Sequence, residues 1–141
     1  MVGFGVINVF DTAGNFVKRF ATGGATLPLY DPWGMVVAPA DFGAFSNALL
    51  VGDFNLGNGA ARPPAGGPGY ILAFSLAPDA DNGKFLGLLE GPDSKPLSID
   101  GLWSLIAGNG HSGGNTSDLY FSESMARPMG SSGASRPAMG R

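Results

Sequence analysis

Two short runs of oxygen-bearing side chains contain the candidate metal ligands of this sequence. In the first run Asp53 and Asn55 directly follow an apolar stretch, and the second run is Asp79-Ala80-Asp81-Asn82-Gly83. Carboxylate and amide oxygens are the hard ligands that Ca²⁺ takes in proteins. Neither run has EF-hand spacing or a closing glutamate, and Asp-rich and Asn-Gly turns are also ordinary hairpin chemistry. Structural turns are the favoured interpretation of both runs, and Asp53 with Asn55 is the better of the two candidate calcium sites.

No residue has the sequence context of a catalytic or cofactor-binding group. His111 is the single histidine, which excludes an H-E-x-x-H zinc motif, and the absence of cysteine excludes thiolate chemistry. No serine lies in a G-x-S-x-G context. The glycine-rich stretch 108–114 precedes neither a helix nor a lysine, as a phosphate-binding loop would require. We therefore assign no catalytic and no cofactor-binding residue, and the sequence does not favour an enzyme.

Two tryptophans stand at equivalent places in the chain. Trp33 and Trp103 each open a short apolar run, Met35-Val36-Val37 in the first case and Leu105-Ile106-Ala107 in the second. If exposed, the indoles offer a stacking platform for a sugar or a base. If buried, they fill the packing between neighbouring sheets, where large aromatics bury much area. Their recurrence at one repeat position favours the packing role.

The elements that position these residues are expected to be short β-strands. β-Branched and aromatic runs alternate with turns, and 24 Gly and 11 Pro punctuate the chain. We expect strands at 6–10, 16–20, 33–38, 48–54, 69–74, 84–89, 103–108 and 118–122. The same order of four strands occurs twice, which is typical of propeller blades. The predicted fold is all-β, a partial β-propeller of about two four-stranded antiparallel blades with long Gly/Pro-rich loops; a β-sandwich is the alternative.

The charge distribution argues against nucleic acid and membrane surfaces as partners. The chain has a net charge of −3, and its acidic residues all precede the C-terminal stretch that holds Arg127, Arg136 and Arg141. Binding to phosphates depends on clustered Lys and Arg, which the acidic body lacks. No apolar run is long enough to span a membrane, and no secretory signal is found at the N-terminus.

The order of these motifs resembles the NHL-type propeller repeat. More closely, residues 3–122 resemble a bacterial family of uncharacterised exported propeller proteins, often from organisms with the PEP-CTERM sorting system. The matching features are Asn8-Val9-Phe10-Asp11, Pro32-Trp33-Gly34, Leu49-Leu50-Val51-Gly52-Asp53-Phe54 and Leu97-Ser98-Ile99-Asp100-Gly101-Leu102-Trp103. The resemblance implies a closed propeller in a longer parent located outside the cytoplasm, extracellular or periplasmic, of which this chain is a fragment.

Residues 1–125 are expected to hold the two blade-like repeats, at about 5–54 and 69–122, and residues 126–141 to form a disordered tail. The tail reverses the charge of the body and loses its apolar periodicity. A frameshift near residue 122 is the favoured hypothesis for both changes, because a valid codon set exists whose reading one nucleotide earlier gives a sequence close to the continuation that the resemblance implies. An ordinary Ser/Gly/Pro/Arg terminus is the alternative.

No specific activity follows from the sequence, and three functional classes stay open. The first is a non-catalytic binding or scaffold segment that engages a protein, a small molecule or a carbohydrate. The second is part of a metal-dependent propeller enzyme of the lactonase or lyase kind. The third is a truncated gene product without a native function. In every case the open blade edges are expected to promote self-association.

Overall fold

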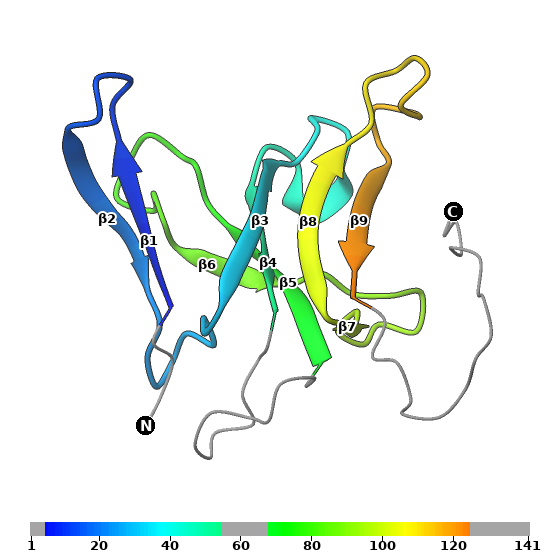
Figure 1. The fold of residues 1–141 in the computed structure, drawn as a ribbon, viewed down its shortest axis with the longest axis horizontal. Coiled ribbons are helices and arrows are strands. Elements are labelled where there is room, and N and C mark those ends of the chain that lie inside the picture. Colours follow the sequence, from blue (N-terminus) through cyan, green and yellow to red (C-terminus); the bar gives the residue numbers. More distant parts are fainter. Residues whose placement is uncertain (1–4, 55–67, 125–141) are drawn as a thin grey trace.

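The chain folds into short antiparallel strands joined by turns. In the computed structural model, which describes residues 5–54 and 68–124, the elements are nine strands and one turn of 3₁₀ helix. Figure 1 shows two hairpins flanking a larger central sheet. The elements are β1 (Val6–Phe10), β2 (Phe16–Thr22), β3 (Pro32–Val37), η1 (Gly43–Phe45), β4 (Leu49–Asp53), β5 (Pro68–Phe74), β6 (Phe85–Leu88), β7 (Ile99–Asp100), β8 (Leu102–Ala107) and β9 (Leu119–Glu123).

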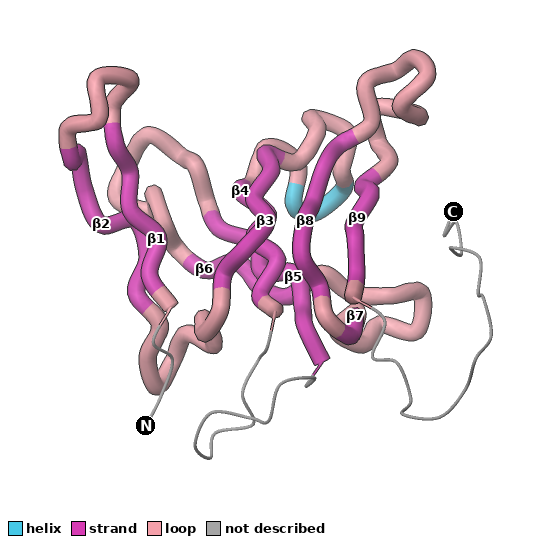
Figure 2. The backbone as a smooth tube through the Cα atoms, in the orientation of Figure 1, coloured by secondary structure: helices cyan, strands magenta, loops and turns pink. Residues whose placement is uncertain are grey.

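The strands form three antiparallel units, which can be followed in Figure 2. Strands β1 and β2 make the first hairpin, and β8 and β9 make the last. The central sheet has the order β3-β4-β5-β6, and the short β7 pairs with the beginning of β5. The register of β4 against β5 is regular, from Leu49 opposite Phe74 to Asp53 opposite Tyr70. Sheet boundaries and sequence repeats are therefore offset, because the central sheet takes two strands from each repeat.

The hairpin turns are built by aspartate and glycine, as their sequences predict. The Oδ1 atom of Asp11 accepts the backbone N–H groups of Ala13 and Asn15 at 2.9 and 2.8 Å. Gly14 has a φ of +86°, which costs glycine little because it lacks a Cβ. These hydrogen bonds also lower the pKa of the Asp11 carboxyl, with the side chain of Asn15 making the largest contribution.

The two hairpins cover opposite faces of the central sheet. Successive strand residues point to opposite faces, and in β4 the buried Leu50 and Val51 belong to different hydrophobic clusters. The cluster on the β1–β2 side has as its buried members Ile7, Ala21, Leu29, Val51, Leu72 and Phe74. The cluster on the β8–β9 side has as its buried members Ala38, Ala48, Leu50, Ile71, Ala73, Ile99, Leu102 and Leu105. The described residues thus form three stacked layers with two cores.

Equivalent positions of the two sequence repeats make equivalent contacts. Phe10 of β1 and Phe16 of β2 meet at a ring-centroid distance of 5.8 Å, and Phe74 of β5 and Phe85 of β6 meet at the same distance. The second pair is covered by the first hairpin, so Phe74 is fully buried, whereas Phe10 is 55% exposed. These equivalent positions therefore make the same ring contact, and the difference in burial comes from the neighbouring layer.

The last hairpin comes very close to the central sheet at Gly34 of β3. A Cβ atom added at Gly34 would lie 2.6 Å from the backbone nitrogen of Leu105 and 2.7 Å from the Cα of Ser104, both in β8. Real Cβ atoms essentially never come this close to other heavy atoms. Glycine is thus required at this position for the backbones of β3 and β8 to pack together.

The eight strands expected from the sequence are all present, with ends that differ by one or two residues. The two-residue strand β7 and the 3₁₀ turn η1 were not predicted, because neither has a periodic apolar pattern. The predicted Gly/Pro/Ala-rich loop lies largely within residues 55–67, and the proposed frameshifted tail within 125–141, both outside the described residues. Within the described ranges no helix is long and apolar enough to cross a membrane.

Candidate functional site

Three aromatic rings meet where β3 and β8 begin. Trp33 and Trp103 lie edge to face, with their ring centroids 4.5 Å apart and their planes at 71°. Phe54, directly after β4, adds a third ring at 5.1 Å from Trp103. The close packing of β3 on β8 at Gly34 brings the two tryptophans together although 70 residues separate them. We call Trp33, Phe54 and Trp103 the aromatic cluster.

The aromatic cluster joins two layers and still presents surface to solvent. Trp33 is 55% exposed and Trp103 is 39% exposed, so neither indole is a core side chain. Edge-to-face aromatic pairs contribute about 0.5–1.5 kcal/mol beyond the area they bury. Their mutual contact joins the two layers as the packing role requires, but the burial that this role implies is not found. The remaining exposure leaves ring surface on which a flat ligand can stack.

Asp53 lies at the end of β4, next to the aromatic cluster, and is fully buried. Its Oδ2 accepts the backbone N–H of Tyr30 at 2.7 Å, and its Oδ1 accepts that of Asp31 at 3.2 Å. A buried carboxylate is costly unless hydrogen bonds compensate for its lost hydration. These bonds tie the end of β4 to the residues that lead into β3. The Asp53 carboxylate therefore helps to fix the start of β3, the strand that carries Trp33.

The calcium site suggested at Asp53 and Asn55 stays a prediction. Both carboxylate oxygens of Asp53 face backbone donors, so a cation there would have to share these oxygens with N–H groups. Asn55 lies outside the described residues. Among residues 5–54 and 68–124 no three His, Asp or Glu side chains are grouped so that they could hold a metal ion.

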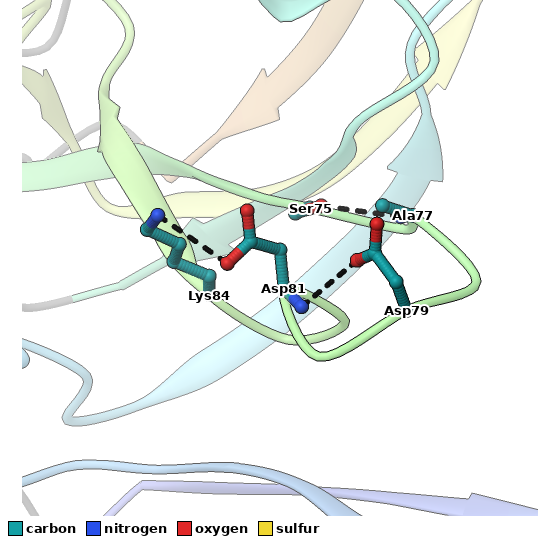
Figure 3. Close-up of polar contacts among 5 residues, drawn as sticks. All are labelled: Ser75, Ala77, Asp79, Asp81 and Lys84. Atoms are coloured by element: carbon teal, nitrogen blue, oxygen red, sulfur yellow. Dashed lines mark hydrogen bonds and ion pairs between the residues drawn. The ribbon is translucent and has the colours of Figure 1, made fainter.

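The second oxygen-rich run forms the turn between β5 and β6, shown in Figure 3. The Oδ1 of Asp79 accepts the backbone N–H of Asp81 at 2.9 Å, and Ser75 Oγ accepts that of Ala77 at 3.1 Å. Asp81 forms an exposed ion pair with Lys84 at 3.4 Å, a kind of contact worth about 0–1 kcal/mol. The side chains of this run thus make the hydrogen bonds of a turn.

His111 lies exposed in the loop between β8 and β9, as its sequence context indicates. Its backbone N–H donates to Asn109 Oδ1 at 2.9 Å, which is again turn chemistry. Beyond the loop, Tyr120 donates its hydroxyl hydrogen to Asp118 Oδ2 at 3.3 Å. Desolvation raises the pKa of Tyr120, and the negative charge of Asp118 raises it further. The Tyr120 phenol therefore stays neutral to a higher pH than an ordinary tyrosine does.

Comparison with known proteins gives sequence relatives but no match to a family or to a solved structure. No family model matches the chain, and no solved structure matches it. The sequence relatives are mimiviral. The uncharacterized protein R648 of Acanthamoeba polyphaga mimivirus is 34% identical over 103 residues, 73% of this chain and 21% of R648. The uncharacterized protein L690 of the same virus is 34% identical over 120 residues, 85% of this chain and 26% of L690. The matches thus span about a fifth to a quarter of these relatives.

These relatives correct the resemblance drawn from the sequence. The motifs had indicated a bacterial, exported, PEP-CTERM-associated family with NHL-like repeats, whereas the proteins similar to this chain are viral. The misassignment arose because short motifs such as Pro32-Trp33-Gly34 encode strand starts and turns, which recur in unrelated β-proteins. No closed barrel or propeller ring is formed by the described residues. The extracellular or periplasmic location was inferred from that resemblance alone and stays a prediction.

Sequence reasoning identified the two tryptophans and missed the third ring. Phe54 follows Asp53 in the first repeat, but the second repeat has Ser124 at that place, so repetition gave no signal for an aromatic there. The sequence signal that could have identified Phe54 as part of the cluster is local, because Phe54 extends a strand that ends beside the start of β3. Its backbone N–H donates to the carbonyl oxygen of Asp31 at 2.9 Å, which holds it there.

Proposed function

We propose that this chain is a non-catalytic scaffold and binding segment whose repeats stack as blades of a β-propeller. One observation carries the proposal: β8 and β9 match β3 and β4 in the sequence repeat, and β8 packs on β3 and β4 as part of the next layer. Propellers are built from four-stranded antiparallel sheets arranged around an axis. The central sheet β3-β4-β5-β6 matches one such sheet, and each flanking hairpin matches half of one.

The length of the relatives supports this proposal. About four stretches the size of the matched segment fit into L690, and each stretch holds nearly two repeats. That number of repeats lies within the range of about four to eight blades that propellers have. A longer protein of this kind would supply the further layers that both ends of the described stack lack.

An electron-microscopy structure of full-length L690 tests the blade assignment. We expect a closed ring of four-stranded sheets, with the residues that align to β3 and β8 on adjacent inner strands. Two face-to-face sheets, as in a β-sandwich, would contradict the assignment. A sandwich has two packed layers, whereas the described residues of this chain already stack three.

The aromatic cluster is a candidate binding site for a ligand with a flat apolar face, such as a carbohydrate ring. The exposure of Trp33 and Trp103 supports this second role, because aromatic side chains combine large apolar contact area with polar edges. The cluster holds both tryptophans of the chain. Intrinsic tryptophan fluorescence therefore reports on this site without interference from elsewhere.

A fluorescence titration with a panel of neutral oligosaccharides and nucleosides tests the binding role. We expect a saturable change for one ligand class, and its loss in Trp33→Leu. Leu76→Ala, at a partly exposed site in the β5–β6 turn region, serves as the matched control and should bind as the unmodified chain does. If no ligand changes the fluorescence, the aromatic cluster has only the structural role of joining two layers.

A further inference from the structure

Each strand of the two flanking hairpins has an open edge, those of β1 and β9 included. Among the described residues β1 pairs only with β2, and β9 pairs only with β8. Sheet edges in monomeric proteins usually carry lysine, proline or inward charges that block pairing with another chain. Strand β1 has none of these, and Glu123 at the end of β9 is the single charge of that strand. Both edges are therefore open to further strands.

The internal repeat indicates which strand would pair with the open edge of β1 and which with that of β9. Strand β1 is equivalent to β5, and β9 is equivalent to β4. In the central sheet β4 and β5 pair directly, in an unbroken antiparallel register. Within one molecule β9 cannot pair with β1, because the two hairpins cover opposite faces of the central sheet (Figure 1). Two molecules placed head to tail can make this pairing.

The exposed faces of β3 and of the β8–β9 hairpin are also complementary in this head-to-tail order. Leu105 of β8 is buried against the central sheet, but its equivalent Met35 in β3 is 47% exposed. Val36 of β3 packs against the core of the β8–β9 side, but its equivalent Ile106 is 64% exposed. The outer face of β8–β9 thus offers the groups that contact a following layer, and β3 offers those that contact a preceding one.

We propose that copies of this chain assemble head to tail, with β9 of one molecule pairing antiparallel with β1 of the next. This inference rests on the proposed blade arrangement. The resulting sheet β8-β9-β1-β2 reproduces the central sheet β3-β4-β5-β6, and it brings Ile106 of one copy over Met35 of the next. Transferring the register of β4 on β5 gives the expected partners Leu119 with Phe10, Tyr120 with Val9, Phe121 with Asn8 and Ser122 with Ile7.

The geometry also limits the size of the assembly. The described residues of each copy contribute one whole sheet and two halves, so each added copy adds two such sheets to a ring. Propeller rings close at about four to eight sheets, which corresponds to about two to four copies. Ser104 stands where β3 has Gly34. The layers at the junction between copies therefore lie further apart than β3 and β8 do within one molecule.

Cysteine cross-linking between two single variants tests the proposed register. The chain has no cysteine, and directly opposed antiparallel residues lie within the Cα separation of about 4.4–6.8 Å that a disulfide spans. We mix full-length Asn8→Cys with Phe121→Cys under mild oxidation and expect the mixed disulfide in preference to either homodisulfide. Asn8→Cys mixed with Tyr120→Cys is the control, since a shift by one residue points the side chains to opposite faces. This control should give no cross-link above background.

Light scattering coupled to size-exclusion chromatography on the full chain gives the second readout. We expect closed oligomers of two to four copies and their loss in Ile106→Glu, whereas Leu76→Glu, outside both faces, should leave them intact. Circular dichroism on the same samples separates the two proposals. A folded β-rich monomer at all concentrations, without the mixed disulfide, would overturn the head-to-tail assembly and leave the blade arrangement standing. An unfolded chain would overturn both.

Discussion

Replacing Gly34 by alanine should destabilise the protein far more than an ordinary glycine-to-alanine change. The new Cβ would lie 2.6–2.9 Å from three backbone atoms of Ser104 and Leu105. Backbone cannot rotate away as a flexible side chain can, so β3 and β8 must separate by several tenths of an ångström. Overpacking of this kind costs about 1–3 kcal/mol. For a chain of this size that lowers the midpoint of thermal unfolding by about 3–12 °C.

Thermal and urea unfolding of the full chain, followed by circular dichroism, measure the effect of Gly34→Ala. Gly24→Ala is the matched control, because a Cβ at Gly24 meets no heavy atom within 4 Å. This control should leave stability unchanged or raise it by about 0.4–1 kcal/mol, since alanine restricts the unfolded chain. Equal stability of the two variants would refute the close approach of β3 to β8, and with it the stacking of the last hairpin.

Three further predictions concern burial, metal binding and pH. Phe74→Ala should cost about 3–5 kcal/mol in urea unfolding, whereas Phe10→Ala at the equivalent exposed position should cost less than about 1 kcal/mol; equal costs would contradict the difference in burial. Added Ca²⁺ should leave the unfolding temperature unchanged, because both oxygens of Asp53 accept backbone hydrogen bonds; a rise that Asp53→Asn abolishes would instead establish the calcium site. The Asp11 carboxyl should titrate below its ordinary pKa of 3.8, chiefly through its hydrogen bond from Asn15. A lowered pKa makes the stabilising effect present above pH 3.8 and lost as the pH falls through the folded-state value. NMR titration checks this, and a normal pKa would contradict it.

Local pattern was sufficient to locate the strands. Runs such as Val6-Ile7-Asn8-Val9-Phe10 combine β-branched and aromatic residues between turn signals, and the structure places β1 there. Alternation of side chains then assigns each residue of a strand to one face of the sheet. The sequence therefore predicted the order of the strands.

The grouping of strands into sheets depends on contacts that a local pattern does not encode. The repeats at about 5–54 and 69–122 read as two units, but hydrogen bonds join β4 to β5 across the boundary between them. The solvent exposure of each strand side chain could not be predicted either, because it depends on whether another layer covers that position. Phe10 and Phe74 have the same local context and opposite burial for this reason.

The aromatic cluster and the contacts of Asp53 could be predicted only in part from the sequence, because they too depend on how the layers pack. Trp33 and Trp103 could be paired by repetition, but their mutual contact depends on the space left by Gly34. Asp53 was recognised as an oxygen ligand, yet its hydrogen bonds to the backbone of Tyr30 and Asp31 become visible only once β3 and β4 are adjacent. The resemblance to a bacterial family failed where it relied on motifs that only define turns and strand starts.

Far-ultraviolet circular dichroism of the two tryptophans tests the stacked-repeat account most directly. Two indoles whose ring centroids lie 4.5 Å apart at a large interplanar angle couple their transitions and give a couplet of opposite-signed bands. We expect this couplet at every protein concentration, and its complete loss in both Trp33→Phe and Trp103→Phe while the β-sheet signal is retained. A folded chain without the couplet would contradict it, because equivalent residues of the two repeats would then not meet.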